Sequence, residues 1–378
     1  MLTLLSERND KRITQKRKRR TRITMGLANK LAAPQIKKLV AYQSARRIGG
    51  IGNNYLNANE SPYPAYQMPK QESWQRYPDF LPGDLTTKYG LYSGTPSDCV
   101  LTTRGADEGI DLLIRAFCEP NKDSIVINTP TYAMYDFIAE AHQVSIAKIA
   151  LTPGDFKLDV PAYGALTAQP KIIFLCHPNN PTGNLLSRQD VLALAKKYSD
   201  EAFVVVDEAY IEFTPSDSFA LDIASTPNLI VLRTLSKAFS LAAVRIGFVL
   251  ANSDVIQLLA KLIAPYPIPD PCARIALNSL SETGVSYMEA QRDRILFSKA
   301  EVEKKLKALS CVERVYPSVT NFLLVKFEDS VKAFDYLVEH GIILRDQAKQ
   351  PGLENHLRIS IGDDIDLQQM LDCLASLK

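Results

Sequence analysis

The chain has 378 residues, of which 46% are hydrophobic and 23% charged, and its formal net charge is +2. This length exceeds one average domain and predicts a large domain with a smaller one, while the composition is ordinary for a globular protein. A net charge so close to zero argues against a dedicated nucleic-acid binder. No segment approaches the roughly 18 apolar residues that a membrane helix needs, so no membrane partner is expected.

One segment near the start departs from this average. "KRITQKRKRRTR" (residues 11–22) holds eight basic residues and no acidic one. Such a run is typical of an anion-binding tail or a targeting signal, and also of a disordered extension. No apolar run follows it, which argues against a secretory signal. We expect residues 1–24 to be a disordered extension or sequence ahead of a start at Met25. The alternative is an anion or nucleic-acid binder whose affinity falls steeply with salt.

From about residue 100 to 250, short apolar runs alternate with helical patterns. The runs are continuous, which predicts strands that are buried on both faces. They are "CVLTTRG", "SIVINTPTY", "KIIFLCHPNNPTG", "AFVVVDEAY", "LIVLRTLSK" and "RIGFVLAN". After the first of them, Ile110, Leu113, Ile114 and Phe117 fall on one face of a predicted helix. Strands that alternate with helices predict an α/β fold with a mostly parallel central sheet flanked by helices.

After about residue 285 the pattern changes to a compact α+β unit. A long, charged, helical stretch precedes the strand "NFLLVKF", and a helix with Gly341 as its C-terminal cap follows. Two more strands, "IILRD" and "LRISIG", lead to a last helix over residues 364–377. We therefore predict a small C-terminal domain at 285–378 and a large domain at 62–284. Residues 25–61 are expected to form an N-terminal arm and part of the small domain.

The cysteines and histidines indicate a reducing compartment and no metal site. The six cysteines are scattered without a CxxC pair, and most of them lie in apolar stretches. They are expected to be buried free thiols, as in a cytoplasmic protein. The four histidines lack metal-ligand spacing, so neither a zinc site nor a histidine-based catalytic pair is predicted.

Polar residues gather where the predicted strands end, and open parallel sheets bind ligands beyond the carboxyl ends of their strands. In chain order these ends read "RGADEG", "TPTYAMY", "HPNNPTG", "VDEAY" and "TLSKAF". They would bring together an acid, a lysine, an asparagine-rich turn, two tyrosines and a glycine turn that opens a helix. This combination suits one cofactor particularly well, pyridoxal phosphate.

Each part of the cofactor's ring would have a partner in this set. Lys237, the only lysine at a strand end, would form a Schiff base with the aldehyde. Asp207 would keep the pyridine nitrogen protonated. Asn180 and Tyr210 could donate to the phenolate oxygen, and the ring of Tyr132 could lie against the face of the cofactor.

The cofactor's phosphate would have partners as well. Backbone N–H groups around Ala106 and Asp107 open a predicted helix, Ser236 offers a hydroxyl and Arg245 a guanidinium. Taken singly, each of these features has a simpler explanation: a solvated lysine, a helix-capping aspartate, an ordinary turn or a surface ion pair. Their occurrence together at consecutive strand ends favours the cofactor.

In these motifs the sequence resembles the fold-type I pyridoxal-phosphate aminotransferases, and among them most closely the histidinol-phosphate aminotransferase family. The resemblance runs from about residue 41 to the C-terminus. "SxxK" and "NNPTG" mark the broad superfamily, whereas "YQSARR" and "GIILRDQ" are far narrower. The motifs that carry it also include "LNANESPY", "RYP", "RGADEGIDLLIRAFCEP", "APYPIP" and "LRISIG". One departure is Ala243, where the family usually has glycine.

The resemblance implies amino transfer between L-histidinol phosphate and 2-oxoglutarate, which gives imidazole acetol phosphate and L-glutamate. Lys237 would hold the cofactor and carry the proton. Tyr77 matches a tyrosine that reaches the cofactor phosphate of the partner subunit, which implies a homodimer. The alternatives are a threonine-phosphate decarboxylase and an aromatic amino-acid aminotransferase.

Three further positions match residues that contact the substrate. They are Tyr42, Arg345 and Arg358. Guanidinium groups suit this reaction because they bind both phosphate and carboxylate in a two-point fashion. For Arg345 an ion pair with the neighbouring Asp346 is the alternative.

Overall fold

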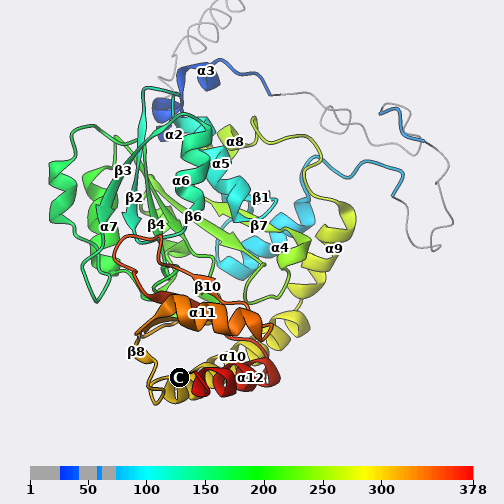
Figure 1. The fold of residues 1–378 in the computed structure, drawn as a ribbon. Helices are drawn as coiled ribbons and strands as arrows, with labels where there is room; N and C mark the ends of the chain where they lie inside the picture. Colours follow the sequence, from blue (N-terminus) through cyan, green and yellow to red (C-terminus); the bar gives the residue numbers. More distant parts are fainter. Residues whose placement is uncertain (1–25, 42–57, 62–73, 378) are drawn as a thin grey trace, which may run out of the picture.

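The computed structural model describes residues 26–41, 58–61 and 74–377. They form a large domain around a seven-stranded sheet and a small domain around a four-stranded sheet (Figure 1). The basic segment 11–22 and the predicted substrate residue Tyr42 lie outside the described residues. In the described part of the chain, no helix is both long and apolar enough to cross a membrane.

The large sheet is mostly parallel, as the sequence predicts. Its strands in spatial order are β1 (Val100–Thr103), β7 (Gly247–Leu250), β6 (Leu229–Thr234), β5 (Phe203–Asp207), β4 (Ile172–Cys176), β2 (Ser124–Thr129) and β3 (Ser145–Ala150). β7 runs antiparallel to both of its neighbours, and the remaining pairs are parallel. All six predicted strands are present. The edge strand β3 is an addition, and most of its residues are at least partly exposed.

Helices cover both faces of this sheet, so its strands are buried on both sides. Along β5, Val204 and Val206 pack into one core, and Phe203 and Val205 into the other. The first core contains residues of α4 (Gly83–Ser93), α7 (Arg188–Lys197) and α9 (Asp270–Ser279). The second contains residues of α2 (Leu27–Leu31), α3 (Pro34–Lys37), α5 (Ala106–Phe117), α6 (Met134–Ala141) and α8 (Ser253–Leu259). This two-sided burial explains the continuous apolar runs.

Short 3₁₀ helices make several of the connections in the large domain. They are η1 (Ser97–Cys99), η2 (Pro161–Ala165), η3 (Ile211–Phe213), η4 (Pro215–Asp217), η5 (Ala220–Ala224) and η6 (Ala242–Val244). Three of them, η3 to η5, lie in the crossover between β5 and β6. β5 ends at Asp207, and β6 ends three residues before Lys237.

The small domain packs three helices on an antiparallel sheet. The strand order is β10 (Arg345–Asp346), β11 (His356–Ser360), β9 (Phe322–Phe327) and β8 (Val312–Val315), and the helices are α10 (Glu282–Leu306), α11 (Ser330–Glu339) and α12 (Asp364–Ala375). Gly341, with φ +78°, follows α11 as the predicted cap. Helix α10 joins the domains, because Met288 packs into a large-domain core and Leu306 into the small-domain core. The domain boundaries at 61/62 and 284/285 remain predictions.

Two glycines allow β7 to lie directly against the turn between β1 and α5. A Cβ atom on Gly247 would lie 2.4 Å from the carbonyl carbon of Gly105 and 2.6 Å from the nitrogen of Ala106. Gly105 has φ +80°, and a Cβ atom on it would lie 2.5 Å from Nη2 of Arg245. This close approach brings Arg245 to the start of α5.

Replacing Gly247 with alanine should destabilise the protein. The atoms that the new methyl group would meet belong to the backbone and cannot rotate away, so we expect a loss of about 1–3 kcal/mol in the free energy of unfolding. Gly83→Ala is the matched control, since its Cβ atom would have no neighbour within 4 Å at the start of α4. Urea unfolding measures both variants, and equal stabilities would show that the close approach is not obligatory.

Candidate active site

A cavity of about 120 Å³ that opens to solvent lies at the carboxyl ends of β4, β5 and β6. Because these strands are parallel neighbours, their ends meet at one edge of the sheet. Nine of the predicted cofactor residues line this cavity: Ala106, Asp107, Tyr132, Asn180, Asp207, Tyr210, Ser236, Lys237 and Arg245. The structure therefore brings together residues that lie up to 139 positions apart, from Ala106 to Arg245.

Asp207, the last residue of β5, has a buried carboxylate. Its Oδ2 atom accepts a hydrogen bond from Oη of Tyr135 at 2.7 Å, and its Oδ1 atom accepts one from the backbone nitrogen of Ala209 at 3.1 Å. No ion pair within the described part of the chain includes Asp207. Burial raises the pKa of Asp207 to about 6, although the two hydrogen bonds act in the opposite direction.

The start of α5 faces the cavity together with Arg245 and Ser236. Asp107, in the first turn of α5, accepts a hydrogen bond from Oη of Tyr132 at 3.0 Å. Its other carboxylate oxygen lies 3.7 Å from Nη2 of Arg245. The residue before the helix is Gly105, which has no side chain to cap the first N–H groups. These N–H groups, the guanidinium and the hydroxyl of Ser236 can together bind an anion.

Lys237 follows the end of β6 by three residues, and its side chain is open to the cavity. Its Nζ atom lies 5.5 Å from the centre of the Tyr210 ring. Partial desolvation and the nearby charge of Arg358 lower the pKa of Lys237, and Asp207 offsets part of this effect. A lowered pKa increases the fraction of neutral amine, which is the nucleophilic form.

Arg358 and Arg345 approach this site from the small domain. Nη1 of Arg358, on β11, donates a hydrogen bond to Oδ1 of Asn180 at 2.5 Å, and Nδ2 of Asn180 lies 3.5 Å from Oη of Tyr210. Arg345, on β10, is exposed and pairs directly opposite Arg358 in the sheet. Within the described residues, no ion pair joins Arg345 to Asp346, whose Oδ1 instead accepts a backbone N–H. Neither arginine lines the cavity itself, but Arg358 contacts Asn180, which does.

Tyr77 does not line the cavity of its own chain. Its ring is half exposed and stacks on the ring of Tyr266, with 4.5 Å between the ring centres. This position differs from those of the nine residues above. The role expected of Tyr77 belongs to the cavity of a partner subunit and stays a prediction.

Residues 51–374 match the family model "Aminotransferase class I and II". The chain belongs to this family. This aminotransferase is 46% identical over 354 residues to a protein named histidinol-phosphate aminotransferase from Pectobacterium carotovorum subsp. carotovorum (strain PC1), an alignment that covers 93% of this chain and 99% of the relative. The predicted family is thereby confirmed.

Solved structures confirm the fold class. The histidinol-phosphate aminotransferase from Clostridium acetobutylicum superimposes with a TM-score of 0.73 at 25% identity, over 80% of this chain and 90% of the other. The enzyme of that name from Sinorhizobium meliloti, in complex with pyridoxal-5'-phosphate, gives a TM-score of 0.71 at 24% identity, over 80% of this chain and 83% of the other.

The cavity of this aminotransferase fits pyridoxal phosphate, the cofactor of its family, which confirms the predicted cofactor. Among the described residues the buried carboxylate of Asp207 forms no ion pair, and a protonated ring nitrogen would supply one. The donors around Arg245, Ser236 and the start of α5 match a phosphate dianion. Lys237 presents an amine of lowered pKa to the same cavity. The individual residue roles remain proposals.

Tyr135 is a residue of the site that the sequence reasoning missed. It is fully buried, stacks on Phe174 with 4.9 Å between the ring centres, and donates to Asp207. The only signal in "PTYAMY" was that Tyr135 lies close to Tyr132 in the sequence; in the structure the two rings pack edge to face, with 5.6 Å between their centres. Cys176, Ala209, Thr234 and Ala242 also line the cavity without having been predicted.

Tyr135→Phe should weaken binding of the cofactor. Phenylalanine keeps the contact with Phe174, but one oxygen of the Asp207 carboxylate loses its donor, which raises the pKa of Asp207 above its present value of about 6. A hydrogen bond to a charged group contributes enough for the dissociation constant of pyridoxal phosphate to rise about tenfold or more. Titration of the cofactor-free protein measures this constant.

Tyr163→Phe is the matched control for this prediction. The hydroxyl of Tyr163 is also buried and donates to Oδ1 of Asn128 at 2.7 Å, but Tyr163 lies outside the cavity. The control should lose stability and bind the cofactor normally. Equal cofactor affinities of the two variants would contradict the role given to Tyr135.

Proposed function

We propose that this aminotransferase transfers an amino group between L-histidinol phosphate and 2-oxoglutarate, giving imidazole acetol phosphate and L-glutamate, a reaction of histidine biosynthesis. The observation that carries the proposal is the pair Arg358 and Arg345 on the small-domain side of the cavity that contains Lys237. The amino donor bears a phosphate and the acceptor bears carboxylates. Guanidinium groups bind both anions, so one site can accept both substrates in turn.

Within this reaction, the residues of the chain have distinct tasks. When bound, pyridoxal phosphate supplies the carbon that takes up the amino group and a ring that withdraws electrons. Arg245, Ser236 and the first turn of α5 would bind its phosphate, and Asp207 would hold a proton at its ring nitrogen. Tyr132 would lie against the ring, and Asn180 and Tyr210 would donate to the ring oxygen.

Lys237 carries the proton in this scheme. Its Nζ atom would hold the cofactor through the aldehyde carbon when no substrate is bound. Its neutral amine would take and hold the proton of the substrate carbon that bears the amino group. Arg358 and Arg345 hold the substrate anion, which fixes the direction in which that proton points.

We further propose that the enzyme works as a homodimer in the cytoplasm. Tyr77 would reach the cofactor phosphate in the cavity of the partner subunit, and Tyr42 would contact the substrate. The exposed ring of Tyr77, outside the cavity of its own chain, supports a role in another subunit. The six free cysteines support a reducing compartment.

Wild-type protein loaded with pyridoxal phosphate should form glutamate from L-histidinol phosphate and 2-oxoglutarate, with a visible absorbance band that shifts when the amino donor is added. Lys237→Ala should lower kcat by at least about 100-fold, because it removes the proton carrier. Lys305→Ala, on the exposed surface of α10, is the matched control and should retain full activity. Coupled glutamate detection and absorbance spectra measure both effects.

Other outcomes would select other functions. Release of CO₂ from threonine phosphate without any need for 2-oxoglutarate would replace the proposal with a decarboxylase. A higher kcat/KM for phenylalanine than for histidinol phosphate would indicate an aromatic amino-acid aminotransferase. A wild-type protein that binds no pyridoxal phosphate would contradict the cofactor site itself.

A further inference from the structure

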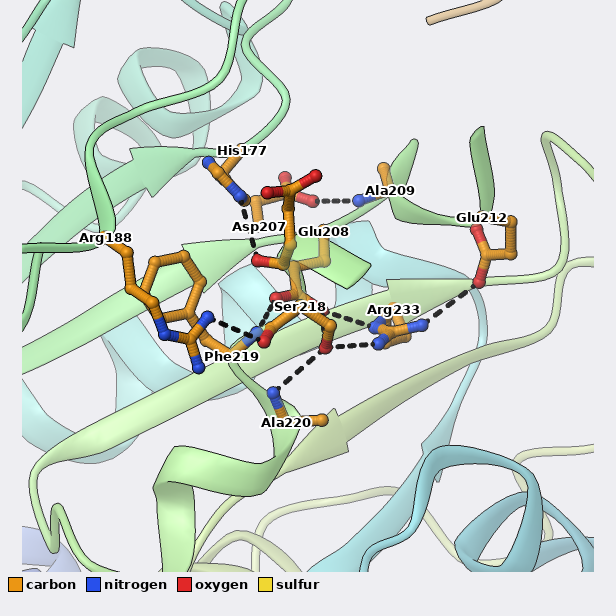
Figure 2. Close-up of polar contacts among 11 residues, drawn as sticks. His177, Arg188, Asp207, Glu208, Ala209, Glu212, Ser218, Phe219, Ala220 and Arg233 are labelled. Atoms are coloured by element: carbon orange, nitrogen blue, oxygen red, sulfur yellow. Dashed lines mark hydrogen bonds and ion pairs between the residues drawn. The ribbon is translucent and has the colours of Figure 1, made fainter. Parts of the chain in front are cut away.

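A buried cluster of charged side chains lies at the ends of β5 and β6, next to Asp207 in the sequence. The guanidinium of Arg233 donates from Nε to Oε2 of Glu208 at 2.6 Å, from Nη1 to Oε1 of Glu212 at 3.2 Å and from Nη2 to Oγ of Ser218 at 2.8 Å. Figure 2 shows Glu208 and Ser218 on one side of the guanidinium and Glu212 on the other. Glu208 also accepts from the backbone nitrogen of Phe219 at 2.5 Å.

This charge cluster, defined as Glu208, Glu212 and Arg233, is not part of the cavity, since none of the three residues lines it. Side chains alternate between the faces of a strand. Val206 of β5 and Val231 of β6 pack into the core opposite α5 and α6. Glu208 lies two residues after Val206, and Arg233 lies two residues after Val231, so both side chains point to the face of these valines. Tyr135, which donates to Asp207, lies on the opposite face.

The charge cluster is nevertheless tied through the backbone to three residues that face the cofactor. Glu208 directly follows Asp207, Glu212 lies two residues after Tyr210, and Arg233 lies four residues before Lys237. The backbone nitrogen of Glu208 also donates to the carbonyl of Leu232 at 2.9 Å, which continues the pairing of β5 with β6. The guanidinium of Arg233 thus connects the three segments that carry Asp207, Tyr210 and Lys237.

We propose that Arg233 is a positioning residue, which holds Asp207, Tyr210 and Lys237 in the mutual arrangement that binds the cofactor. Its planar fork fixes directions as well as distances, which a hydrophobic contact or a lysine would not do. The proposal rests on the cofactor roles given above to these three residues.

Stability alone does not explain the charge cluster. Desolvating buried ions costs so much that well-packed apolar residues of similar volume often give an equally or more stable protein. Oε2 of Glu212 has no hydrogen-bond partner among the described residues, and burial raises the pKa of Glu212 to about 7. The charge cluster therefore lowers the free energy of unfolding relative to an apolar core, while its three contacts fix the orientation of Arg233. Both properties are expected of a group that orients its neighbours.

Arg233→Met tests the proposal through cofactor binding rather than turnover. We expect the variant to bind pyridoxal phosphate at least about tenfold more weakly at a temperature where it is fully folded, and its visible absorbance band to titrate at a shifted pH, because Asp207 and Lys237 lose their mutual alignment. Circular dichroism establishes the folded fraction. Since no substrate is used, failure here is separate from failure of the proposed reaction.

Arg188→Met is the matched control. Arg188 donates to the carbonyl of Ser218 at 3.0 Å (Figure 2). It also pairs with Asp222, so it contacts the same crossover without reaching Glu208. It should bind the cofactor like the wild type. An Arg233→Met protein that is less stable but keeps the wild-type dissociation constant and absorbance titration would overturn the proposal.

A second variant covers the case in which Arg233→Met does not fold. Arg233→Lys keeps a positive charge between the two buried carboxylates, but a single ammonium cannot reproduce three directed contacts. Cofactor binding weakened by about threefold or more would support the positioning role. Wild-type affinity and an unshifted absorbance titration in Arg233→Lys would overturn it.

Discussion

The carboxylate of Asp207 is buried at the end of β5, and within the described residues it forms no ion pair. Burial raises its pKa to about 6, above the ordinary value for aspartate. In the cofactor-free protein, unfolding therefore allows Asp207 to lose its proton at a lower pH than in the folded state. The contribution of Asp207 to the free energy of unfolding is highest at low pH and falls as the pH rises through about 4 to 6. A protonated ring nitrogen would restore the missing positive charge, so cofactor binding is coupled to the ionisation of Asp207.

The strand order explains why the other groups converge on this carboxylate. β4, β5 and β6 run parallel, so Asn180, Asp207 and Lys237 emerge at one edge of the sheet. β7 runs antiparallel to β6, so its start, and with it Arg245, lies at the same edge. β1 runs antiparallel to β7 and delivers Gly105 and the first turn of α5 there as well. A single reversed strand thus places the anion-binding groups beside the acid and the amine.

Much of this arrangement could be predicted because its signals are local. Continuous apolar runs identified the buried strands, and the side chains at their ends identified nine residues of the cavity. The remaining features depend on contacts between distant parts of the chain. The edge strand β3 has little apolar signal, and Arg233 in "LIVLRTLSK" is indistinguishable from a solvated strand end until Glu208 and Glu212 are placed around it. The supporting hydrogen bond of Tyr135 likewise requires α6 and β5 to meet.

The central claim is that the buried charge of Asp207 is unpaired until the cofactor binds. Its most direct test compares the free energy of unfolding of cofactor-free Asp207→Asn protein with that of the wild type at several pH values. Near pH 4 the two should be similar, and by about pH 7.5 the variant should be more stable by about 3 kcal/mol, since the pKa of Asp207 moves from 3.8 to about 6. The same variant should bind pyridoxal phosphate more weakly than the wild type. A stability difference that does not change with pH, together with unchanged cofactor affinity, would contradict the role given to Asp207.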